Sequence, residues 1–139
     1  MEEALVIHTD GGARGNPGPA AAAFVIEHGG RVLHSDSKFL GNATNNFSEY
    51  QGVLLALGWI LANRSKIPSA PLIFYLDSEL IVRQLMGVYK VKDENLRKLF
   101  LEVNSLIKQL KTKAVFNSVP RSKNKVADFL VNQELDKNI

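Results

Sequence analysis

The chain has 139 residues, enough for a single domain (residues 1–139) and too few for a second one. Hydrophobic residues make up 45% and charged residues 22% of the sequence, which is typical of a folded globular protein and not of a disordered one. The absence of cysteine excludes disulfides, cysteine nucleophiles and thiolate metal sites. The 17 basic and 14 acidic side chains leave a net charge of +3, a small excess that is compatible with a polyanionic partner.

The first five residues, MEEAL, are acidic and lead into a short apolar run, which is not the pattern of a signal peptide. No apolar stretch reaches the roughly 18 residues that a membrane span needs. We therefore expect a cytoplasmic protein without membrane contacts. No feature of the sequence calls for an obligatory protein partner, so we expect a monomer.

The first third of the chain predicts three strands, at residues 4–10, 20–27 and 31–40. Residues 11–19 are rich in glycine and proline and predict a loop after the first strand. Gly29 and Gly30 separate the second and third runs and predict a tight hairpin. These three strands are expected to form an antiparallel meander.

The rest of the chain alternates helices and strands. Apolar residues at helical spacing predict a helix at residues 49–63, and a continuous apolar run at 72–76 predicts a buried strand. A short helix at 78–86, a helix capped by Asp93, a strand at 114–119 and a last helix capped by Asn124 follow. This order predicts an α/β fold, with a mixed five-stranded sheet of three antiparallel strands and then parallel strands, and helices on both faces.

Four carboxylates stand out by their places on these elements. Asp10 and Asp77 end two predicted central strands, Glu49 opens the first long helix, and Asp128 lies in the last helix. Ligands bind at the carboxyl edge of such sheets. A carboxylate cluster needs a compensating cation, and all-oxygen ligands favour Mg²⁺ or Mn²⁺. Two such ions can form the clamp that drives in-line phosphoryl displacement.

Each carboxylate also has a purely structural interpretation. Asp10 and Asp77 are common turn and N-cap residues. Glu49 lies three residues after Asn46, as in a capping box, and Asp128 could face solvent. The sequence leaves both interpretations open for each residue taken alone.

Four stretches, in order, resemble the motifs of type 1 ribonuclease H: TDGGARGNPG at residues 9–18, TNNFSEY at 44–50, LDS at 76–78 and VPRSKNKVAD at 119–128. The resemblance implies a ribonuclease H-like fold and hydrolysis of the RNA strand of RNA–DNA hybrids, leaving 5′-phosphate ends. It implies two Mg²⁺ ions per site with substrate, with Mn²⁺ as a possible substitute. It also implies that the catalytic metal ligands are Asp10, Glu49, Asp77 and Asp128.

The same resemblance implies the residues that bind the hybrid. Across the minor groove these are Gly11, Gly12, Asn16, Asn45 and Asn46, and Thr44 is expected to hold a DNA phosphate. The physical chemistry agrees, because the 2′-hydroxyl that distinguishes RNA from DNA both donates and accepts, and so does an Asn side chain.

The sequence departs from the family in two places. Ser118 stands where bacterial members carry a loop histidine, and the short segment 87–92 replaces a longer basic segment. Arg121, three residues after Ser118, is the expected catalytic substitute because it stays charged and can hold a phosphate oxygen. Lys123 and Lys125 could contact phosphates nearby. His8 shares strand parity with Asp10, but we expect it to pack on the sheet.

Three other functions remain possible at this level. The first is a hybrid-binding module with weakened catalysis, suggested by Ser118; the four retained carboxylates count against it. A sugar-kinase-like ATPase fragment would need a duplicated domain, and a resolvase or transposase core would need DNA-end recognition elements. The sequence leaves open the cleavage preference, the choice between Mg²⁺ and Mn²⁺, the cutting of double-stranded RNA and the oligomeric state.

Overall fold

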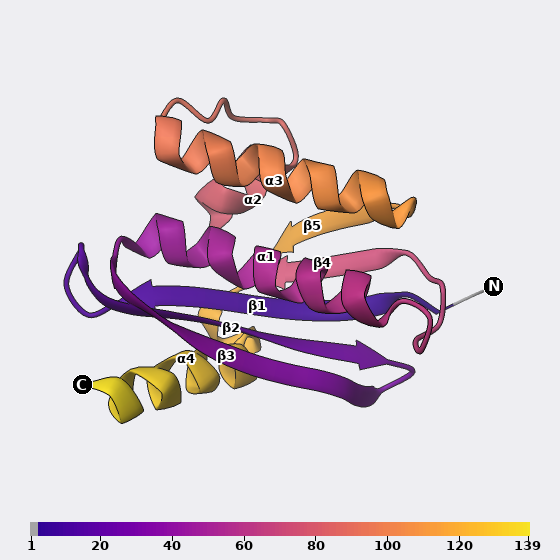
Figure 1. The fold of residues 1–139 in the computed structure, drawn as a ribbon, viewed down its shortest axis with the longest axis horizontal. Helices are drawn as coiled ribbons and strands as arrows, with labels where there is room; N and C mark the ends of the chain where they lie inside the picture. Colours follow the sequence, from indigo (N-terminus) through magenta and orange to yellow (C-terminus); the bar gives the residue numbers. More distant parts are fainter. Residues whose placement is uncertain (1–2) are drawn as a thin grey trace.

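Five strands form one mixed sheet in the order β3-β2-β1-β4-β5 (Figure 1). In this computed structural model, which describes residues 3–139, β1 pairs antiparallel with β2 and β2 with β3, while β4 runs parallel to β1 and β5 to β4. The strands are β1 (Leu5–Ala13), β2 (Gly18–His28), β3 (Arg31–Ala43), β4 (Leu72–Leu76) and β5 (Ala114–Ser118). The helices are α1 (Asn45–Asn63), α2 (Glu79–Leu85), α3 (Glu94–Leu110), the 3₁₀ turn η1 (Arg121–Lys123) and α4 (Lys125–Asn138).

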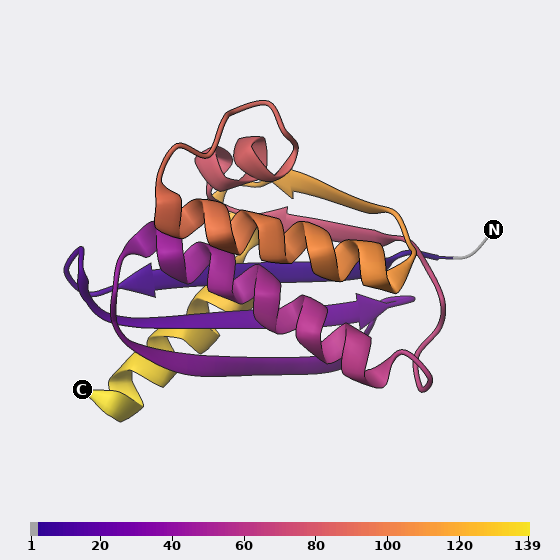
Figure 2. The same ribbon diagram turned by 45° about the horizontal axis from the view of Figure 1, so that its top comes forward.

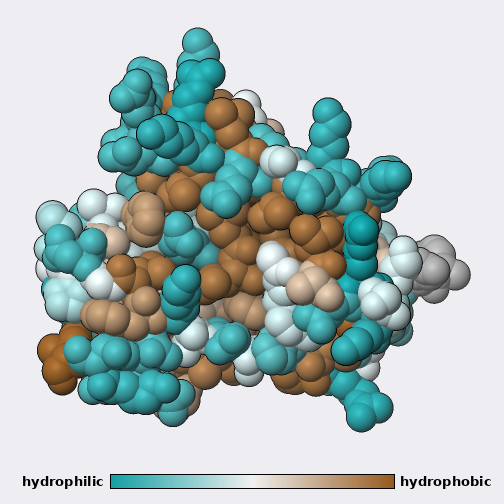
Figure 3. Space-filling view, in the orientation of Figure 1, coloured by the Kyte–Doolittle hydropathy of each residue, from teal (hydrophilic) through white to brown (hydrophobic). Residues whose placement is uncertain are grey.

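The helices cover both faces of the sheet, as the sequence predicts. Helices α1 and α3 pack side by side on one face, and α4 crosses the other face over β1, β2 and β3 (Figure 2). The main core lies under α1 and α3 and includes Ile7, Leu57 and Phe74, which are fully buried. Figure 3 shows apolar side chains along the junction of these two helices with hydrophilic ones around them, and the partly buried Leu54 and Leu106 belong to the same cluster.

A second, smaller cluster lies between β2 and α4. It joins Ala21 and Ala23 to Val131 and Leu135, and the four alanines of β2 at positions 20–23 are completely buried. Because their side chains are single methyl groups, the backbone of β2 can lie close to helices on both of its faces. At positions 20–23 of β2, single methyl groups are therefore the side chains that lie between this strand and the helices α1 and α4.

Strand β1 is longer than predicted. It continues three residues past Asp10, and Gly11, Gly12 and Ala13 pair with alanines 22, 21 and 20 of β2. The prediction of a loop from residue 11 is wrong. Two adjacent glycines are typical of a turn, but here small residues on both strands extend the hydrogen-bonded pairing of β1 with β2. The remaining loop spans residues 14–17.

The start of α1 and the capping of α4 also differ from the prediction. Helix α1 begins at Asn45, four residues early, and its N-cap is Thr44, whose hydroxyl accepts a hydrogen bond from the Phe47 amide at 3.2 Å. Asn46 therefore makes no capping box with Glu49. Asn124 precedes α4, as predicted, but its side chain makes no cap hydrogen bond.

Asp93 caps α3 as predicted, accepting from the Leu96 amide at 3.0 Å. Residues 1 and 2, which belong to the acidic start of the chain, lie outside the described residues, so the expectation about a signal peptide is not tested there. Within residues 3–139, the helices are too short or too polar to cross a membrane.

Candidate active site

Three of the predicted carboxylates meet just beyond the stretch where β1 and β4 pair, which ends at His8 and Tyr75. Asp10 in β1, Glu49 in α1 and Asp77 just after β4 each offer an oxygen atom, and these three oxygens lie within 4.8 Å of one another. Asp10 and Glu49 are each only 5% exposed, and Asp77 is half-buried. The residues are far apart in the sequence, so the fold alone creates this cluster.

Close backbone packing of α1 on β1 brings Glu49 to Asp10. A Cβ atom on Gly11 would lie 2.1 Å from the carbonyl oxygen of Ser48, and one on Gly52 would lie 2.8 Å from the carbonyl oxygen of Asp10. Only glycine fits at either contact. The Gly11 amide donates a hydrogen bond to Oε1 of Glu49 at 3.1 Å, which fixes the carboxylate beside β1.

The cluster has unusual electrostatics. Burial raises the pKa of Asp10 from 3.8 to about 7, and the charges of Asp77 and Asp128 add to this effect. Burial also raises the pKa of Glu49 well above its ordinary value, with the charge of Asp10 as the next cause. The pKa of Asp77 is raised too, chiefly by burial. In the absence of a cation, the cluster therefore resists full ionisation near neutral pH.

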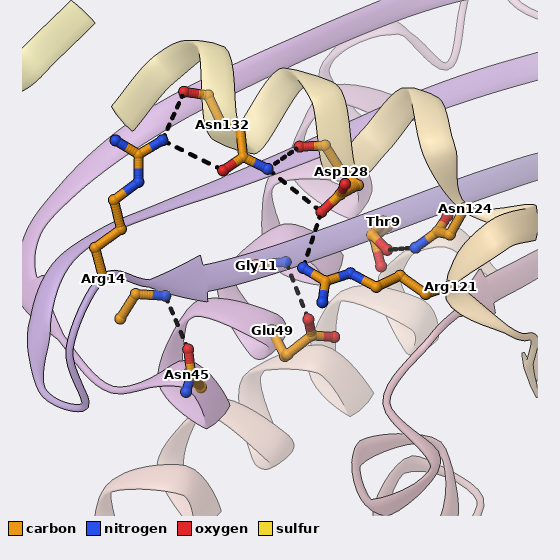
Figure 4. A network of polar contacts seen from close by, with 10 residues as sticks. Thr9, Gly11, Arg14, Asn45, Glu49, Arg121, Asn124, Asp128 and Asn132 are labelled. Carbon is orange, nitrogen blue, oxygen red and sulfur yellow. Dashed lines mark hydrogen bonds and ion pairs between the residues drawn. The ribbon is translucent and has the colours of Figure 1, made fainter. Parts of the chain in front are cut away.

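Asp128 lies at the rim of the cluster and not inside it. Its side chain is 30% exposed, and its Oδ1 accepts a hydrogen bond from Nη2 of Arg121 at 3.3 Å. Arg121 is 78% exposed and reaches over the cleft from the turn η1 (Figure 4). Ser118 is exposed at the end of β5, paired with Leu76 of β4.

A cleft of about 580 Å³ contains the carboxylates and part of the predicted substrate set. Gly12, Asn45 and Asn46 line it together with all four acidic residues and Arg121. A neighbouring hollow of about 680 Å³ is lined by Asn16, Thr44 and again Asn46. The predicted substrate residues therefore lie along two adjoining depressions next to the carboxylates.

The asparagines of this surface hold one another in place. Oδ1 of Asn45 accepts from the Ala13 amide at 2.8 Å, and Oδ1 of Asn16 accepts from the Asn45 amide at 3.0 Å. Both bonds use the carbonyl end of the side chain, so the NH₂ groups of Asn16 and Asn45 remain available as donors. Gly11 also lines the cleft, and its amide donates to Glu49.

The sequence interpretation gave no site role to three further residues. Asn124 is 1% exposed, donates from Nδ2 to the carbonyl oxygen of Thr9 at 2.9 Å, and lowers the pKa of Asp77 through a hydrogen bond, against the larger effect of burial. Arg14 contacts Asn132, and Asn132 in turn contacts Asp128 (Figure 4). The sequence contains a pattern that indicates these residues. Positions 124, 128, 132 and 136 are all Asn or Asp, and their four-residue spacing places them on one helix face. His8 packs edge-on against Tyr75, as expected.

The comparisons with known proteins agree with this geometry. A family described as "Reverse transcriptase-like" matches residues 8–134. The structure of LC11-RNase H1, in complex with an RNA/DNA hybrid, superposes with a TM-score of 0.91 at 41% sequence identity, covering 96% of this chain and 98% of that one. The N-terminal RNase H domain of Rv2228c from Mycobacterium tuberculosis gives a TM-score of 0.88 at 34% identity, covering 98% of this chain and 96% of that one.

Among curated proteins, ribonuclease HI of Halobacterium salinarum is 33% identical over 128 residues, covering 91% of this chain and 62% of that protein. The bifunctional protein Rv2228c of Mycobacterium tuberculosis is 36% identical over 135 residues, and the match covers 95% of this chain but 35% of that longer protein. The chain thus spans about a third of the length of this relative. It belongs to the type 1 ribonuclease H family, as its four motifs predict.

Proposed function

We propose that this chain hydrolyses the RNA strand of RNA–DNA hybrids in a reaction that depends on divalent cations. The single observation that carries the proposal is the cluster of Asp10, Glu49 and Asp77 oxygens within 4.8 Å of one another. Asp128, Asn45 and Asn46 line the same cleft. The likeness to LC11-RNase H1, whose structure was solved in complex with an RNA/DNA hybrid, supports the substrate class.

The residues present fit a hard cation. Oε2 of Glu49 is buried and accepts no hydrogen bond from residues 3–139. Burial, with a smaller contribution from the neighbouring carboxylates, raises the pKa values of Asp10 and Glu49, and a bound cation would offset both effects. Oxygen-only ligands favour Mg²⁺, with Mn²⁺ as a substitute. We propose two ions, held by Asp10, Glu49, Asp77 and Asp128. When bound, they would supply activation of the attacking water and stabilisation of charge at the scissile phosphate.

The chain's own residues position the substrate. The NH₂ groups of Asn16 and Asn45 can donate to 2′-hydroxyls, and Gly12 lines the cleft without a side chain, which leaves room for the sugar. Asn46 lines both depressions and can contact either strand. The hydroxyl of Thr44 accepts from the Phe47 amide and keeps its own hydrogen to donate to a DNA phosphate.

Arg121 is proposed as the residue that compensates for Ser118. Its guanidinium stays charged at every physiological pH and can bind a phosphate oxygen beside Asp128. This supports an active enzyme over the alternative of a hybrid-binding module with weakened catalysis. The products proposed are a 5′-phosphate and a 3′-hydroxyl end.

A gel assay with an end-labelled RNA–DNA hybrid tests the proposal, with matched double-stranded DNA and double-stranded RNA alongside. We expect cleavage of the hybrid RNA in Mg²⁺, none in EDTA, and none by an Asp10→Asn variant. Cleavage in EDTA, or binding of the hybrid without any cleavage in Mg²⁺ or Mn²⁺, would overturn it. The double-stranded RNA lane decides whether the substrate class extends to that duplex.

A further inference from the structure

A chain of hydrogen bonds joins the loop between β1 and β2 to Asp128 (Figure 4). Nη2 of Arg14 donates to Oδ1 of Asp136 at 2.7 Å and to Oδ1 of Asn132 at 3.3 Å. Nδ2 of Asn132 then donates to the backbone oxygen of Asp128 at 3.0 Å and lies 3.4 Å from its Oδ1. Arg14 and Asn132 are 118 positions apart, so these hydrogen bonds connect the N-terminal and C-terminal parts of the sequence.

The bonds fix which end of the Asn132 side chain faces Asp128. A guanidinium has donors and no acceptor, so only the oxygen of the amide can face Arg14. The NH₂ group must then face the carboxylate of Asp128, where it is attractive. The two Asp128 oxygens favour the same orientation, because both accept from this NH₂ group. Arg14 reinforces it by holding the amide oxygen from the other side, which restricts the Asn132 side chain.

Asp128 needs such support more than Glu49 does. Glu49 is 5% exposed and is held by the Gly11 amide, whereas the Asp128 side chain is 30% exposed on the surface of a helix. The two side chains that hold it, Asn132 and Arg121, both contact Oδ1. This arrangement leaves Oδ2 to a cation or to the substrate.

The loop that carries Arg14 also belongs to the substrate side. Asn16, two residues later, accepts from the Asn45 amide at the start of α1, and Ala13, one residue earlier, donates to the Asn45 side chain. The same short segment is thus bonded to α1 through Asn45 and to α4 through Asn132 and Asp136. A displacement of this loop would be transmitted to Asp128 through Asn132.

We propose that Arg14 and Asn132 are positioning residues, which hold the Asp128 carboxylate in the orientation that binds metal and couple it to the substrate loop. This inference rests on the proposed function and names residues outside the four motif carboxylates. The side chains of Arg14 and Asp136 are 42% and 69% exposed, and exposed ion pairs add little to the free energy of unfolding. The effect is therefore expected in metal binding and turnover, not in stability.

The test compares Arg14→Ala, Asn132→Ala and the double variant with Gln133→Ala, an exposed neighbour on α4. We expect both single variants to lower kcat by about tenfold, the equivalent of one hydrogen bond, with the KM for the hybrid unchanged. The Mg²⁺ concentration for half-maximal activity should rise. Calorimetric titration of the free protein with Mg²⁺ should show weaker binding in both variants and wild-type binding in Gln133→Ala.

The double variant shows whether Arg14 and Asn132 act through one series of hydrogen bonds or through two independent contacts. If Arg14 acts through Asn132, the double variant loses no more activity than Asn132→Ala alone. Additive losses would overturn the proposal. A second result would also overturn it: an increased KM and a shallower salt dependence of hybrid binding in Arg14→Ala, with wild-type KM and salt dependence in Asn132→Ala. That result would mean that Arg14 binds a phosphate directly.

Failure of the proposed function would look different. If the wild-type chain cleaves no hybrid in Mg²⁺ or Mn²⁺, the assignment of activity fails, while the Mg²⁺ titrations of the same four variants still decide whether Arg14 and Asn132 position Asp128. Equal Mg²⁺ affinity in wild type, Arg14→Ala and Asn132→Ala would overturn the inference by itself. Equal melting temperatures among the variants would show that any loss does not come from unfolding.

Discussion

The amide of Gly11 donates to Oε1 of Glu49 across a separation of 38 residues, at a point where the backbones of β1 and α1 are in contact. This contact exists because neither Gly11 nor Gly52 has a side chain. The strand that carries Asp10 and the helix that carries Glu49 therefore form one rigid unit, and the spacing of two acidic groups is set by backbone packing.

Replacing Gly11 by alanine should disrupt this unit. The new Cβ would lie 2.1 Å from the Ser48 oxygen, so α1 must move, and we expect a loss of about 3 kcal/mol in the free energy of unfolding together with loss of activity. Gly12→Ala is the matched control, because its Cβ would lie 3.9 Å from Cγ1 of Val131, an ordinary contact. Urea denaturation of both variants measures the difference, and equal stabilities would contradict the close-packing argument.

Asp77→Asn should abolish cleavage without unfolding the protein. The N-cap of α2 is Ser78, whose hydroxyl accepts from the Ile81 amide at 3.3 Å, so the structural interpretation of Asp77 as a cap is wrong. Ser78→Ala should instead lower the free energy of unfolding by about 1 kcal/mol. Circular dichroism melting curves of the two variants, read beside the hybrid assay, check this. A strongly destabilised Asp77→Asn protein would restore the capping role.

The metal-free protein should lose stability as the pH rises towards neutrality. The pKa of Asp10 is raised in the folded state from 3.8 to about 7, mainly by burial, so the folded protein binds more protons than the unfolded chain between these values. The contribution of Asp10 is thus fully present below 3.8 and is lost as the pH rises through about 7. Thermal melts in EDTA across this range should show the decline, and Asp10→Asn should flatten it. Added Mg²⁺ should stabilise the wild type more at the upper end of the range than at the lower end.

Arg121→Ala should lower turnover on the order of tenfold, because it removes a charged donor beside Asp128, where we propose that it binds a phosphate oxygen. Lys123→Ala, in the same turn, should have a smaller effect, as expected of a solvated charge. Ser118→His should change turnover modestly, in the upward direction, since a histidine there can accept or donate a proton near neutral pH. Steady-state kinetics on the three variants decide the matter. Wild-type kinetics in Arg121→Ala would remove Arg121 from the site.

Much of the fold follows from the sequence, for physical reasons that particular residues illustrate. The apolar run 72–76 has strand length and no polar residue, so a buried strand was the natural prediction. The apolar stripe of α3 shows the helical period directly, and Asp93 marks the start of this helix. Asp10 and Asp77 could be placed together because parallel central strands end at the same edge of a sheet.

Other features depend on neighbours that are distant in the sequence. Gly11 and Gly12 read as a turn from local preference, but pairing with the alanines of β2 keeps them in the strand. Thr44, and not Asn46, is the N-cap because of where β3 ends and α1 begins. The contact of Arg14 with Asn132 spans 118 positions, and no local pattern specifies it, although the polar row on α4 indicates which face turns towards the site.

The four buried alanines of β2 also act as a spacer between two catalytic elements. Helix α1, which carries Glu49, packs on one side of this strand, and α4, which carries Asp128, packs on the other through Val131 and Leu135. The separation of these two carboxylates is therefore set by the thickness of a strand whose side chains are single methyl groups. Adding carbon atoms at Ala21 would push on Val131 and Leu135, which line the cleft, and would widen the proposed metal site from behind.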